Sequence, residues 1–401
     1  MIKNGFDIRT IEDAKIEGKK IIVRVDFNIS LTEKLTIADD ARIRQSLPTV
    51  QLLLKNNNKL ILISHLNRPE KRDPKHSLKV VSRHLQTLLP GYTVILIDDF
   101  LTDKGKEMIA HQKENEIIML ENIRFYREEK KNDGAFVQKL SELADIYVND
   151  AFGVSHRNDA SVVGLPHFLP SYAGILLSKE IEIIGNALKK PKKPLVVIIG
   201  GAKISTKIDL IGRLIEIADY VLIGGGLANT FLCAQEYPIG KSFCEHAHID
   251  QAKKLLFLAA QKNTAVILPS DVVIGHPKNS ENGGEVRKIG EVPHKVSILD
   301  IGPETQARFG SIIAKAKTII WNGPVGYFEN SSFKRGTDFI YYAIAQNADA
   351  VSIVGGGDTL AAISNEEYLH KITHISTGGG AMLEFIEKGT LPGIKALQFK
   401  V

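Results

Sequence analysis

The sequence predicts an α/β protein built from two doubly wound, Rossmann-like parallel-sheet domains joined by an interdomain helix. Short runs rich in Val, Ile and Leu recur along all 401 residues and alternate with segments of helical periodicity. Continuous apolar runs of this kind are typical of parallel strands buried on both faces. A break rich in Lys and Pro at residues 189–194 separates the runs into two series. Each series is long enough to form a doubly wound sheet.

The individual elements follow from these patterns. In the first series we expect strands at residues 21–25, 60–64, 93–97, 117–120 and 146–148. In the second series we expect them at residues 195–199, 220–223, 265–268, 318–321, 350–354 and 374–376. Residues 171–188 have apolar positions at helical spacing and end in lysines before Pro191, which predicts a helix. The expected parts are an N-terminal domain over 1–170, an interdomain helix over 171–190 and a C-terminal domain over 191–385.

Composition excludes several classes of protein. Hydrophobic residues make up 44% and charged residues 24% of the chain, which is typical of a folded globular protein and excludes a disordered or fibrous one. The net charge is +5, but no run of Lys and Arg is long enough to indicate a nucleic-acid or membrane surface. Two cysteines cannot form a disulfide framework, and neither a signal peptide nor a bilayer-spanning segment is recognisable. We therefore expect a cytoplasmic protein that binds neither nucleic acid nor membrane.

Charged and hydrogen-bonding side chains follow the strands of the first half. They are Arg24, Asp26, Asn28, Arg42, His65, Arg68, Arg124 and Arg157. The carboxyl ends of parallel strands meet at one edge of a sheet, where ligands bind. One arginine at such a place is more often a surface or ion-pair residue, but several together favour a ligand, because a guanidinium pairs bidentately with carboxylate or phosphate. This half therefore predicts a site for a small anion of several charges.

Glycines follow the strands of the second half. They occur at 200–201, 224–226, 323, 355–357 and 378–380. Glycine lets backbone N–H groups approach a phosphate closely, and a helix that starts just afterwards adds the positive end of its dipole. A single Gly-Gly pair indicates no more than a tight turn, whereas this repetition predicts a phosphate-binding edge.

Several familiar motifs are absent or incomplete. No segment matches the G-x-x-x-x-G-K-[ST] phosphate loop. Three near matches to the dinucleotide fingerprint G-x-G-x-x-G have Asn229, Leu360 or Leu383 in place of the last glycine, which disfavours a nicotinamide cofactor. Residues 156–159 resemble the kinase H-R-D loop but contain an extra Asn, and no D-F-G follows. Residues 244–248 contain Cys and His without the spacing of a metal site.

Taken together, the motifs at the strand ends resemble those of the phosphoglycerate kinase family. Eight of them occur in the family's order over almost the whole chain: 24–28 (Arg-Val-Asp-Phe-Asn), 64–69 (Ser-His-Leu-Asn-Arg-Pro), 120–125 (Leu-Glu-Asn-Ile-Arg-Phe), 149–153 (Asn-Asp-Ala-Phe-Gly), 200–203 (Gly-Gly-Ala-Lys), 321–324 (Trp-Asn-Gly-Pro), 355–359 (Gly-Gly-Gly-Asp-Thr) and 376–381 (Ser-Thr-Gly-Gly-Gly-Ala). The family resemblance implies reversible, Mg²⁺-dependent phosphoryl transfer between ATP and the carboxylate of 3-phosphoglycerate, which gives ADP and 1,3-bisphosphoglycerate in glycolysis and gluconeogenesis.

The resemblance also implies roles for individual residues. The phosphoglycerate would be held by Asp26, Asn28, Arg42, His65, Arg68, Arg124 and Arg157. The nucleotide would be held by Lys203, Lys207, Asn322, Glu329, Gly356, Gly357, Asp358 and Thr359, and Mg²⁺ by Asp358. The transferring phosphoryl group would be stabilised by Arg42, Lys203 and the backbone at Gly379 and Gly380. The family further implies a monomer whose C-terminal segment, 386–401, joins the N-terminal domain.

The implied chemistry is direct in-line transfer after hinge closure. The attacking carboxylate is already ionised at neutral pH, so no general base is needed, and we interpret His65 as a hydrogen-bonding partner of the substrate and His156 as structural. Three positions depart from the family pattern. Asn67 replaces a glycine, Ser30 a proline and Tyr327 a smaller aliphatic residue, from which we expect altered loop stiffness.

Two alternatives remain at this point. A nicotinamide-dependent dehydrogenase shares the doubly wound fold, and a non-catalytic binding protein is compatible with both fold and charge. Titration with NAD and ATP separates the first alternative from a kinase. Coupled turnover with phosphoglycerate and ATP separates the second.

Overall fold

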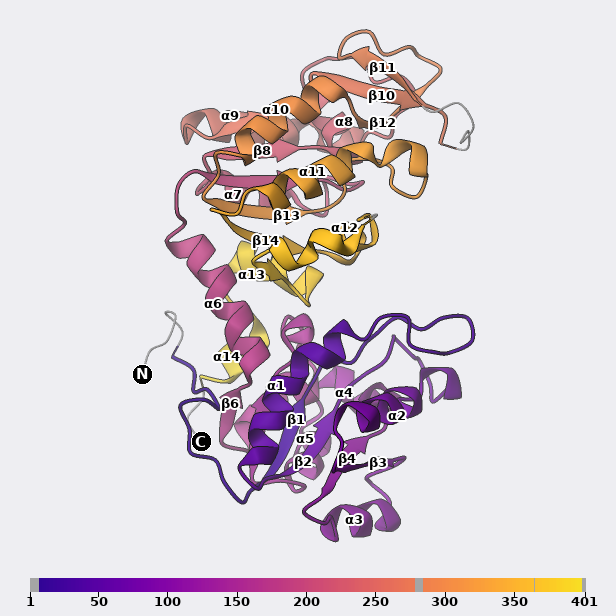
Figure 1. Ribbon diagram of the computed structural model, residues 1–401, viewed down its shortest axis with the longest axis vertical. Helices are drawn as coiled ribbons and strands as arrows, with labels where there is room; N and C mark the ends of the chain where they lie inside the picture. Colours follow the sequence, from indigo (N-terminus) through magenta and orange to yellow (C-terminus); the bar gives the residue numbers. More distant parts are fainter. Residues whose placement is uncertain (1–6, 278–283, 364, 399–401) are drawn as a thin grey trace. The chain divides into compact units, whose positions relative to one another are not determined.

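The computed structural model describes residues 7–277, 284–363 and 365–398. The chain divides into two compact units: a first unit of Met1–Glu182 with Lys388–Val401, and a second unit of Ile183–Glu387. The division falls inside helix α6 (Ile175–Lys189), which is labelled in Figure 1. Among the described residues, no helix is both long and apolar enough to cross a membrane.

The first unit is a parallel six-stranded sheet with the order β3-β4-β2-β1-β5-β6. Its strands are β1 (Lys20–Arg24), β2 (Lys59–Ile63), β3 (Thr93–Ile97), β4 (Glu116–Leu120), β5 (Ile146–Asn149) and β6 (Ser171–Ala173). Its helices, which surround the sheet in Figure 1, are α1 (Ala41–Lys55), α2 (Lys79–Leu88), α3 (Asp103–Ala110), α4 (Arg127–Lys131), α5 (Gly134–Ser141) and α14 (Pro392–Ala396). Val, Ile and Leu fill the central strands, whose residues are almost completely buried, as expected for a sheet covered on both faces.

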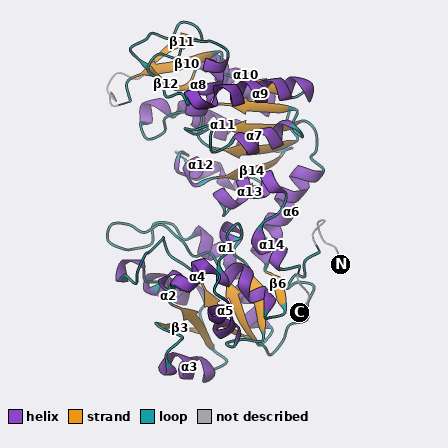
Figure 2. Ribbon diagram, turned by 180° about the vertical axis from the view of Figure 1, so that it is seen from behind, coloured by secondary structure: helices purple, strands orange, loops and turns teal. Residues whose placement is uncertain are grey.

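The second unit contains another parallel six-stranded sheet, with the order β15-β14-β13-β7-β8-β9. Its strands are β7 (Leu195–Ile199), β8 (Tyr220–Ile223), β9 (Ala265–Ile267), β13 (Thr318–Asn322), β14 (Val351–Gly355) and β15 (His374–Ile375). Its helices are α7 (Ile208–Ile215), α8 (Gly225–Ala234), α9 (Ile249–Gln261), α10 (Pro303–Ile313), α11 (Arg335–Gln346), α12 (Gly357–Ala361) and α13 (Gly379–Lys388). Figure 2 shows these strands between helices when the molecule is seen from behind.

The predicted fold class is confirmed, and each predicted strand is present within one or two residues of its expected bounds. A three-stranded antiparallel sheet of the second unit was missed: β10 (Asp271–Gly275), β11 (Glu285–Lys288) and β12 (Ser297–Ile301). Its strand β11 is Glu-Val-Arg-Lys and is largely exposed, so it has no apolar run from which a strand could be predicted.

The predicted helix over 171–188 is wrong at its start. Residues Ser171–Ala173 form strand β6, which pairs in parallel with β5, and α6 begins only at Ile175. The apolar residues of a short edge strand continue directly into the helical stripe, so periodicity alone does not separate the two. The chain from Lys388 onward belongs to the first unit, where Gly393 N donates to the Ser155 carbonyl at 2.8 Å.

The first turn of α6 is held by a buried carboxylate at the end of β5. Asp150 Oδ1 accepts hydrogen bonds from the backbone N–H of Leu176 at 2.9 Å and of Leu177 at 3.3 Å. Asp150 is completely buried, and burial raises the pKa of its carboxyl to about 8. An ionised carboxylate at a helix N-terminus is favourable, but removal from water opposes ionisation more strongly here.

We expect this carboxyl to make stability fall as the pH rises. The folded chain holds the Asp150 proton up to about pH 8, whereas an unfolded chain releases it near pH 3.9. Between these values the unfolded state binds one proton fewer, so the free energy of unfolding decreases by about 1.4 kcal/mol per pH unit through this group. Urea unfolding at pH 5 and pH 8 should therefore show a shallower decrease for Asp150→Asn than for wild type. Equal slopes would contradict this, and Asp349→Asn, whose carboxylate is 80% exposed, is the matched control.

Candidate functional site

The first group of predicted site residues lies at the carboxyl edge of the first unit's sheet. Asp26 follows β1, and Arg42 lies in the first turn of α1. Arg42 Nη1 donates to Asp26 Oδ2 at 3.1 Å and to the Asn28 carbonyl at 3.0 Å. The Arg42 side chain remains 34% exposed, so this guanidinium is positioned by the protein and still accessible to a ligand.

His65 is deeply buried at this edge, at 2% exposure. Its Nδ1 lies 3.3 Å from Arg24 Nη2 and 3.8 Å from Asp26 Oδ1. Burial lowers the pKa of His65 well below its ordinary value, and the charges of Arg24, Arg124, Arg157 and Arg42 lower it further. Four guanidinium groups therefore act on one imidazole, which stays neutral and can only share a hydrogen bond with a ligand.

The arginines of this edge have more hydrogen-bond donors than the protein uses. Arg124 Nη1 donates to the Asn67 carbonyl at 2.6 Å. Its Nε and Nη2, and Nε of Arg157, are buried without a hydrogen-bond partner among the described residues. The nearest carboxylate oxygen to Arg124 Nη2 is Asp159 Oδ2, at 3.8 Å, which is too far for a hydrogen bond. Burial and the charges of Arg157 and Arg24 lower the pKa of Arg124 to about 10. Unpartnered donors and mutual repulsion together indicate a place for an anion.

Asn67 shows how the structure accommodates a departure from the family pattern. Its φ is +58°, in the left-handed region that glycine enters freely and asparagine more readily than most other residues. Its backbone N–H donates to Asn28 Oδ1 at 2.7 Å, and its carbonyl accepts from Arg124. Arg68, the next residue, is exposed.

Arg24 belongs to the same cluster, although the family resemblance did not assign it to the phosphoglycerate. Its side chain is fully buried, and Nε donates to Ser161 Oγ at 2.8 Å. Ser161 Oγ in turn donates to Glu129 Oε1 at 2.5 Å. Glu129 is completely buried as well, and burial raises the pKa of its carboxyl to about 7. These partners come from distant parts of the chain, so no sequence spacing pointed to them, whereas the strand-end position of Arg24 did offer a signal.

In the second unit the glycine-rich strand ends line a polar hollow of about 380 Å³. Gly356 has a φ of +110°, and a Cβ at Gly379 would lie 2.7 Å from the Gly356 Cα. Only glycine fits such a close approach of two backbone segments. The lining residues include Lys203, Lys207, Asn322, Gly356, Gly357, Asp358, Thr359, Gly379 and Gly380.

Lys207 and Lys203 differ in how the protein holds them. Lys207 Nζ donates to the Gly200 carbonyl and to Asn322 Oδ1, both at 2.7 Å. Burial lowers the pKa of Lys207 to about 8, partly offset by the charge of Asp358. The Lys203 side chain is exposed to the hollow. Lys207 is thus fixed in place by two hydrogen bonds, whereas the structure shows no such bond for the exposed Lys203 side chain among the described residues.

The hydroxyl of Thr359 and the amide of Asn322 organise the backbone of this hollow. Thr359 Oγ1 accepts from the Gly323 N–H at 2.8 Å and donates to the Gly355 carbonyl at 2.9 Å. Asn322 Nδ2 donates to the same carbonyl at 2.6 Å. These bonds connect the ends of β13 and β14. The two side chains therefore fix the backbone that lines the hollow.

A second, apolar cavity of about 400 Å³ adjoins the polar hollow. Both are lined by Gly201, Ala202, Pro324 and Asp358. Glu329 lines the apolar cavity and is the one predicted nucleotide-binding residue that does not line the polar hollow. An apolar cavity with few polar groups suits a flat base. The adjoining glycine-lined hollow suits the phosphates of the same nucleotide. Sequence reasoning missed most of the apolar walls, because aliphatic side chains around a ligand have the same pattern as a core.

Asp358 offers the carboxylate expected of a Mg²⁺ site. It lies at the start of α12, is exposed and lines both cavities. No group of three or more His, Cys, Asp or Glu side chains in the described part of the chain is arranged to hold a metal by itself. Mg²⁺ usually binds through one or two carboxylates together with substrate phosphates and water. Asp358 therefore fits a metal that arrives with a nucleotide rather than a permanent metal site.

Comparison with known proteins agrees with this geometry. The family model described as phosphoglycerate kinase matches residues 11–389. Among curated relatives, the phosphoglycerate kinases of Moorella thermoacetica and Dictyoglomus turgidum are each 45% identical over 393 residues, covering 98% of this chain and 99% of the relative.

Solved structures give the same result. The phosphoglycerate kinase of Coxiella burnetii is 38% identical with a TM-score of 0.87, over 97% of this chain and 98% of that one. The enzyme of Pyrococcus horikoshii OT3 is 32% identical with a TM-score of 0.79, over 98% of both chains. Sequence, fold and the arrangement of strand-end residues thus lead to one conclusion: the chain belongs to the phosphoglycerate kinase family.

Proposed function

We propose that the chain catalyses reversible phosphoryl transfer between ATP and the carboxylate of 3-phosphoglycerate, acting as a cytoplasmic monomer. The observation that supports this most strongly is the arginine cluster of the first unit, where buried N–H groups of Arg124 and Arg157 lack partners among the described residues. A small trianion such as 3-phosphoglycerate offers carboxylate and phosphate oxygens to such donors. Asp26, Asn28, Arg42, His65, Arg68, Arg124 and Arg157 are the residues that we assign to it.

The nucleotide is assigned to the second unit. Its phosphates would meet Lys203, Lys207, Asn322 and the backbone of Gly356, Gly357 and Thr359 in the polar hollow, and its ribose would meet Glu329. Asp358 would hold Mg²⁺ together with these phosphates. When bound, Mg²⁺ supplies positive charge that neutralises the phosphate oxygens.

The chain's own residues position and neutralise the reacting groups. A carboxylate oxygen of 3-phosphoglycerate attacks the γ-phosphorus, and the bond from that phosphorus to the ADP oxygen breaks. Arg42 and Lys203 would stabilise the charge on the transferring group, with N–H groups at Gly379 and Gly380. The neutral His65 takes no proton in this scheme and only orients the substrate.

A coupled assay tests the proposal. The chain is incubated with 3-phosphoglycerate, ATP and Mg²⁺, and formation of 1,3-bisphosphoglycerate is followed by its reduction with a coupling dehydrogenase and NADH. We expect turnover that requires all three additions. Absence of turnover, with both ligands shown to bind by calorimetry, would favour a non-catalytic binding protein instead.

We also expect the chain to close when both substrates are present. The substrates are assigned to different units, and a phosphoryl group in transfer must be kept from water. X-ray scattering should therefore give a smaller radius of gyration with 3-phosphoglycerate and a non-hydrolysable ATP analogue together than with either alone. The same radius in the apo and doubly liganded chain would rule out hinge closure.

A further inference from the structure

The apolar cavity of the second unit contains a buried polar atom that has no hydrogen-bond partner among the described residues. Asn229, on helix α8, is 2% exposed and lines this cavity. Its Nδ2 donates to the Phe243 carbonyl at 3.2 Å, whereas its Oδ1 has no hydrogen-bond partner among the described residues. A buried carbonyl oxygen without a donor is unfavourable, and in a ligand cavity it indicates a donor on the ligand.

The orientation of this amide follows from its one hydrogen bond. A backbone carbonyl only accepts, so the atom of Asn229 that faces Phe243 must be the NH₂ group. The unpartnered atom is therefore the acceptor Oδ1. The segment around Phe243 is also held independently, because Glu245 N donates to Thr230 Oγ1 at 3.2 Å.

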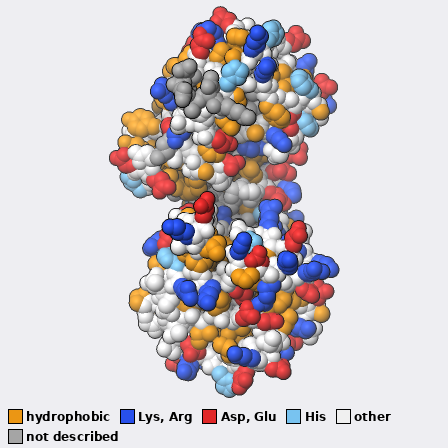
Figure 3. All heavy atoms as spheres, turned by 90° about the vertical axis from the view of Figure 1, so that its right-hand side faces the viewer, with side chains coloured by type: hydrophobic (Ala, Val, Ile, Leu, Met, Phe, Trp, Pro, Cys, Tyr) orange, Lys and Arg blue, Asp and Glu red, His pale blue; other side chains and the backbone are white. Residues whose placement is uncertain are grey.

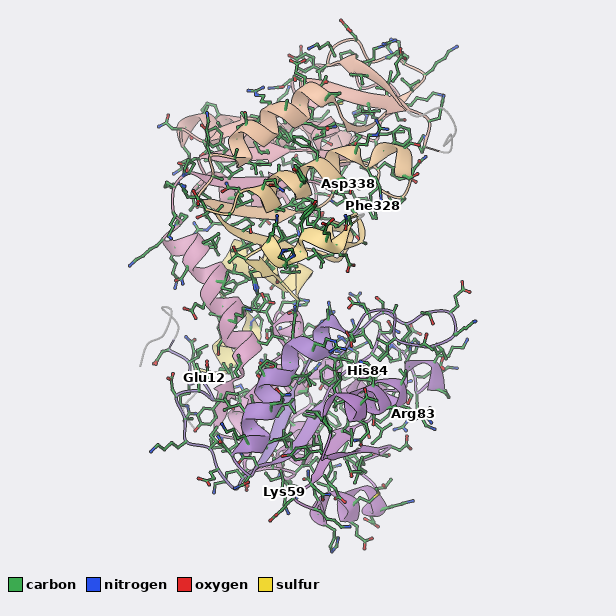
Figure 4. All side chains as sticks on the ribbon, viewed as in Figure 1. Glu12, Lys59, Arg83, His84, Phe328 and Asp338 are labelled. Carbon is green, nitrogen blue, oxygen red and sulfur yellow. The ribbon has the colours of Figure 1, made fainter. Side chains whose placement is uncertain are left out.

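The rest of the cavity supplies surfaces for a flat ring. Its walls include Leu299 and Val325, and two aromatic side chains, Phe243 at 52% exposure and Tyr327 at 40%. Phe328, labelled in Figure 4 on the loop after β13, lines it as well. Apolar and aromatic walls hold any purine, because every base has a π-face. Discrimination between purines must therefore come from a polar group at the ring edge.

We propose that Asn229 is a specificity-determining residue that accepts a hydrogen bond through Oδ1 from the exocyclic amino group of adenine. This inference rests on the proposed function, since it places the nucleotide base in the apolar cavity. Its consequence is a preference for ATP over a nucleotide that is identical except for this amino group.

Purine riboside triphosphate is that nucleotide, because it has hydrogen in place of the 6-amino group. We expect kcat/KM with 3-phosphoglycerate to be about 10-fold higher for ATP than for this analogue, the size of one neutral hydrogen bond. In Asn229→Leu, which keeps the branched shape and the number of heavy atoms and removes both polar atoms, the ratio should approach one, mainly through a loss of activity with ATP.

Phe243→Leu is the matched control in the same cavity. It reduces contact with the faces of both purines, so it should lower kcat/KM for both nucleotides in similar proportion and preserve their ratio. Thermal unfolding of each variant shows whether it is folded. Should Asn229→Leu not fold, the ratio of kcat/KM for ATP to that for the analogue is compared instead between the wild type and Asn229→Ser.

Two results would overturn the inference: a ratio near one in the wild type, or a 10-fold ratio that persists without the Asn229 amide. Failure of the proposed function is distinguishable from both, because it abolishes turnover with either nucleotide. In that case calorimetric titration with ATP and with purine riboside triphosphate gives the ratio of their affinities. A ratio near one in the wild type, or a ratio that persists without the Asn229 amide, would again overturn the inference.

Discussion

Replacing Lys203 by alanine lowers kcat about 10³-fold while nucleotide binding stays measurable. The Lys203 side chain is exposed to the polar hollow, whereas Lys207 is bound to Gly200 and Asn322. A cation that is free to follow the transferring phosphoryl group acts mainly in the transition state, and charged groups in this role contribute about 10³-fold or more to kcat. Steady-state kinetics and calorimetry with ATP measure the two quantities separately.

Controls make this prediction specific. Lys254→Ala removes an exposed lysine from α9 of the same unit and should leave kcat unchanged. Lys203→Arg keeps the charge and should retain part of the activity. A Lys203→Ala enzyme with near wild-type kcat would remove Lys203 from the mechanism.

Arg42→Ala should lower kcat by about 10²–10³-fold, as the loss of one preorganised donor does in other active sites. The Arg42 guanidinium is held by Asp26 and the Asn28 carbonyl and still partly exposed. Because we assign it to the transferring group, kcat should fall more than KM for 3-phosphoglycerate rises. Kinetics at varied 3-phosphoglycerate concentration separate the two effects.

The same substitution leaves Asp26 buried without its ion-pair partner, so thermal unfolding must accompany the kinetics. Arg42→Lys restores a charge but not the planar fork and should recover only part of kcat. Arg44→Ala is the matched control, because Arg44 lies on the same helix and pairs with Asp40 near the surface. A rise in KM alone would reassign Arg42 to ground-state binding.

The sheets could be predicted from the sequence because parallel strands buried on both faces leave continuous apolar runs. Leu195–Ile199 and Thr318–Asn322 are buried along their whole length, and the runs at 195–199 and 318–321 stand out in the sequence. Strand β11 is exposed and polar and could not be recognised, and β6 merged with the apolar stripe of α6. Periodicity reports burial, so it fails where an element is short or exposed.

The candidate site residues were predictable where side chains follow strands closely. His65 follows β2 in the first sheet and Lys203 follows β7 in the second, and within each parallel sheet such positions share one edge. The supporting residues are different: Glu129 and Ser161 hold Arg24 from other elements, and Asn229 lines the apolar cavity from helix α8. Tertiary packing alone brings these residues together.

The net charge of the chain, +5, does not reveal where the anion site lies. On the face shown in Figure 3, Lys and Arg side chains lie beside Asp and Glu over both units rather than in one stripe. The arginines that matter are distinguished by burial and missing partners, as at Arg124. In the sequence, these arginines are recognised by their positions after strands and not by the net charge of the chain.

Direct transfer between two bound substrates is the central claim, and isotope exchange tests it most directly. The chain is mixed with Mg²⁺, ATP and radiolabelled ADP, and label entering ATP is measured with and without 3-phosphoglycerate. The claim predicts exchange only when 3-phosphoglycerate is present, because no residue of the protein carries the phosphoryl group. Exchange at a comparable rate without 3-phosphoglycerate would demonstrate a phosphorylated enzyme intermediate and contradict the claim.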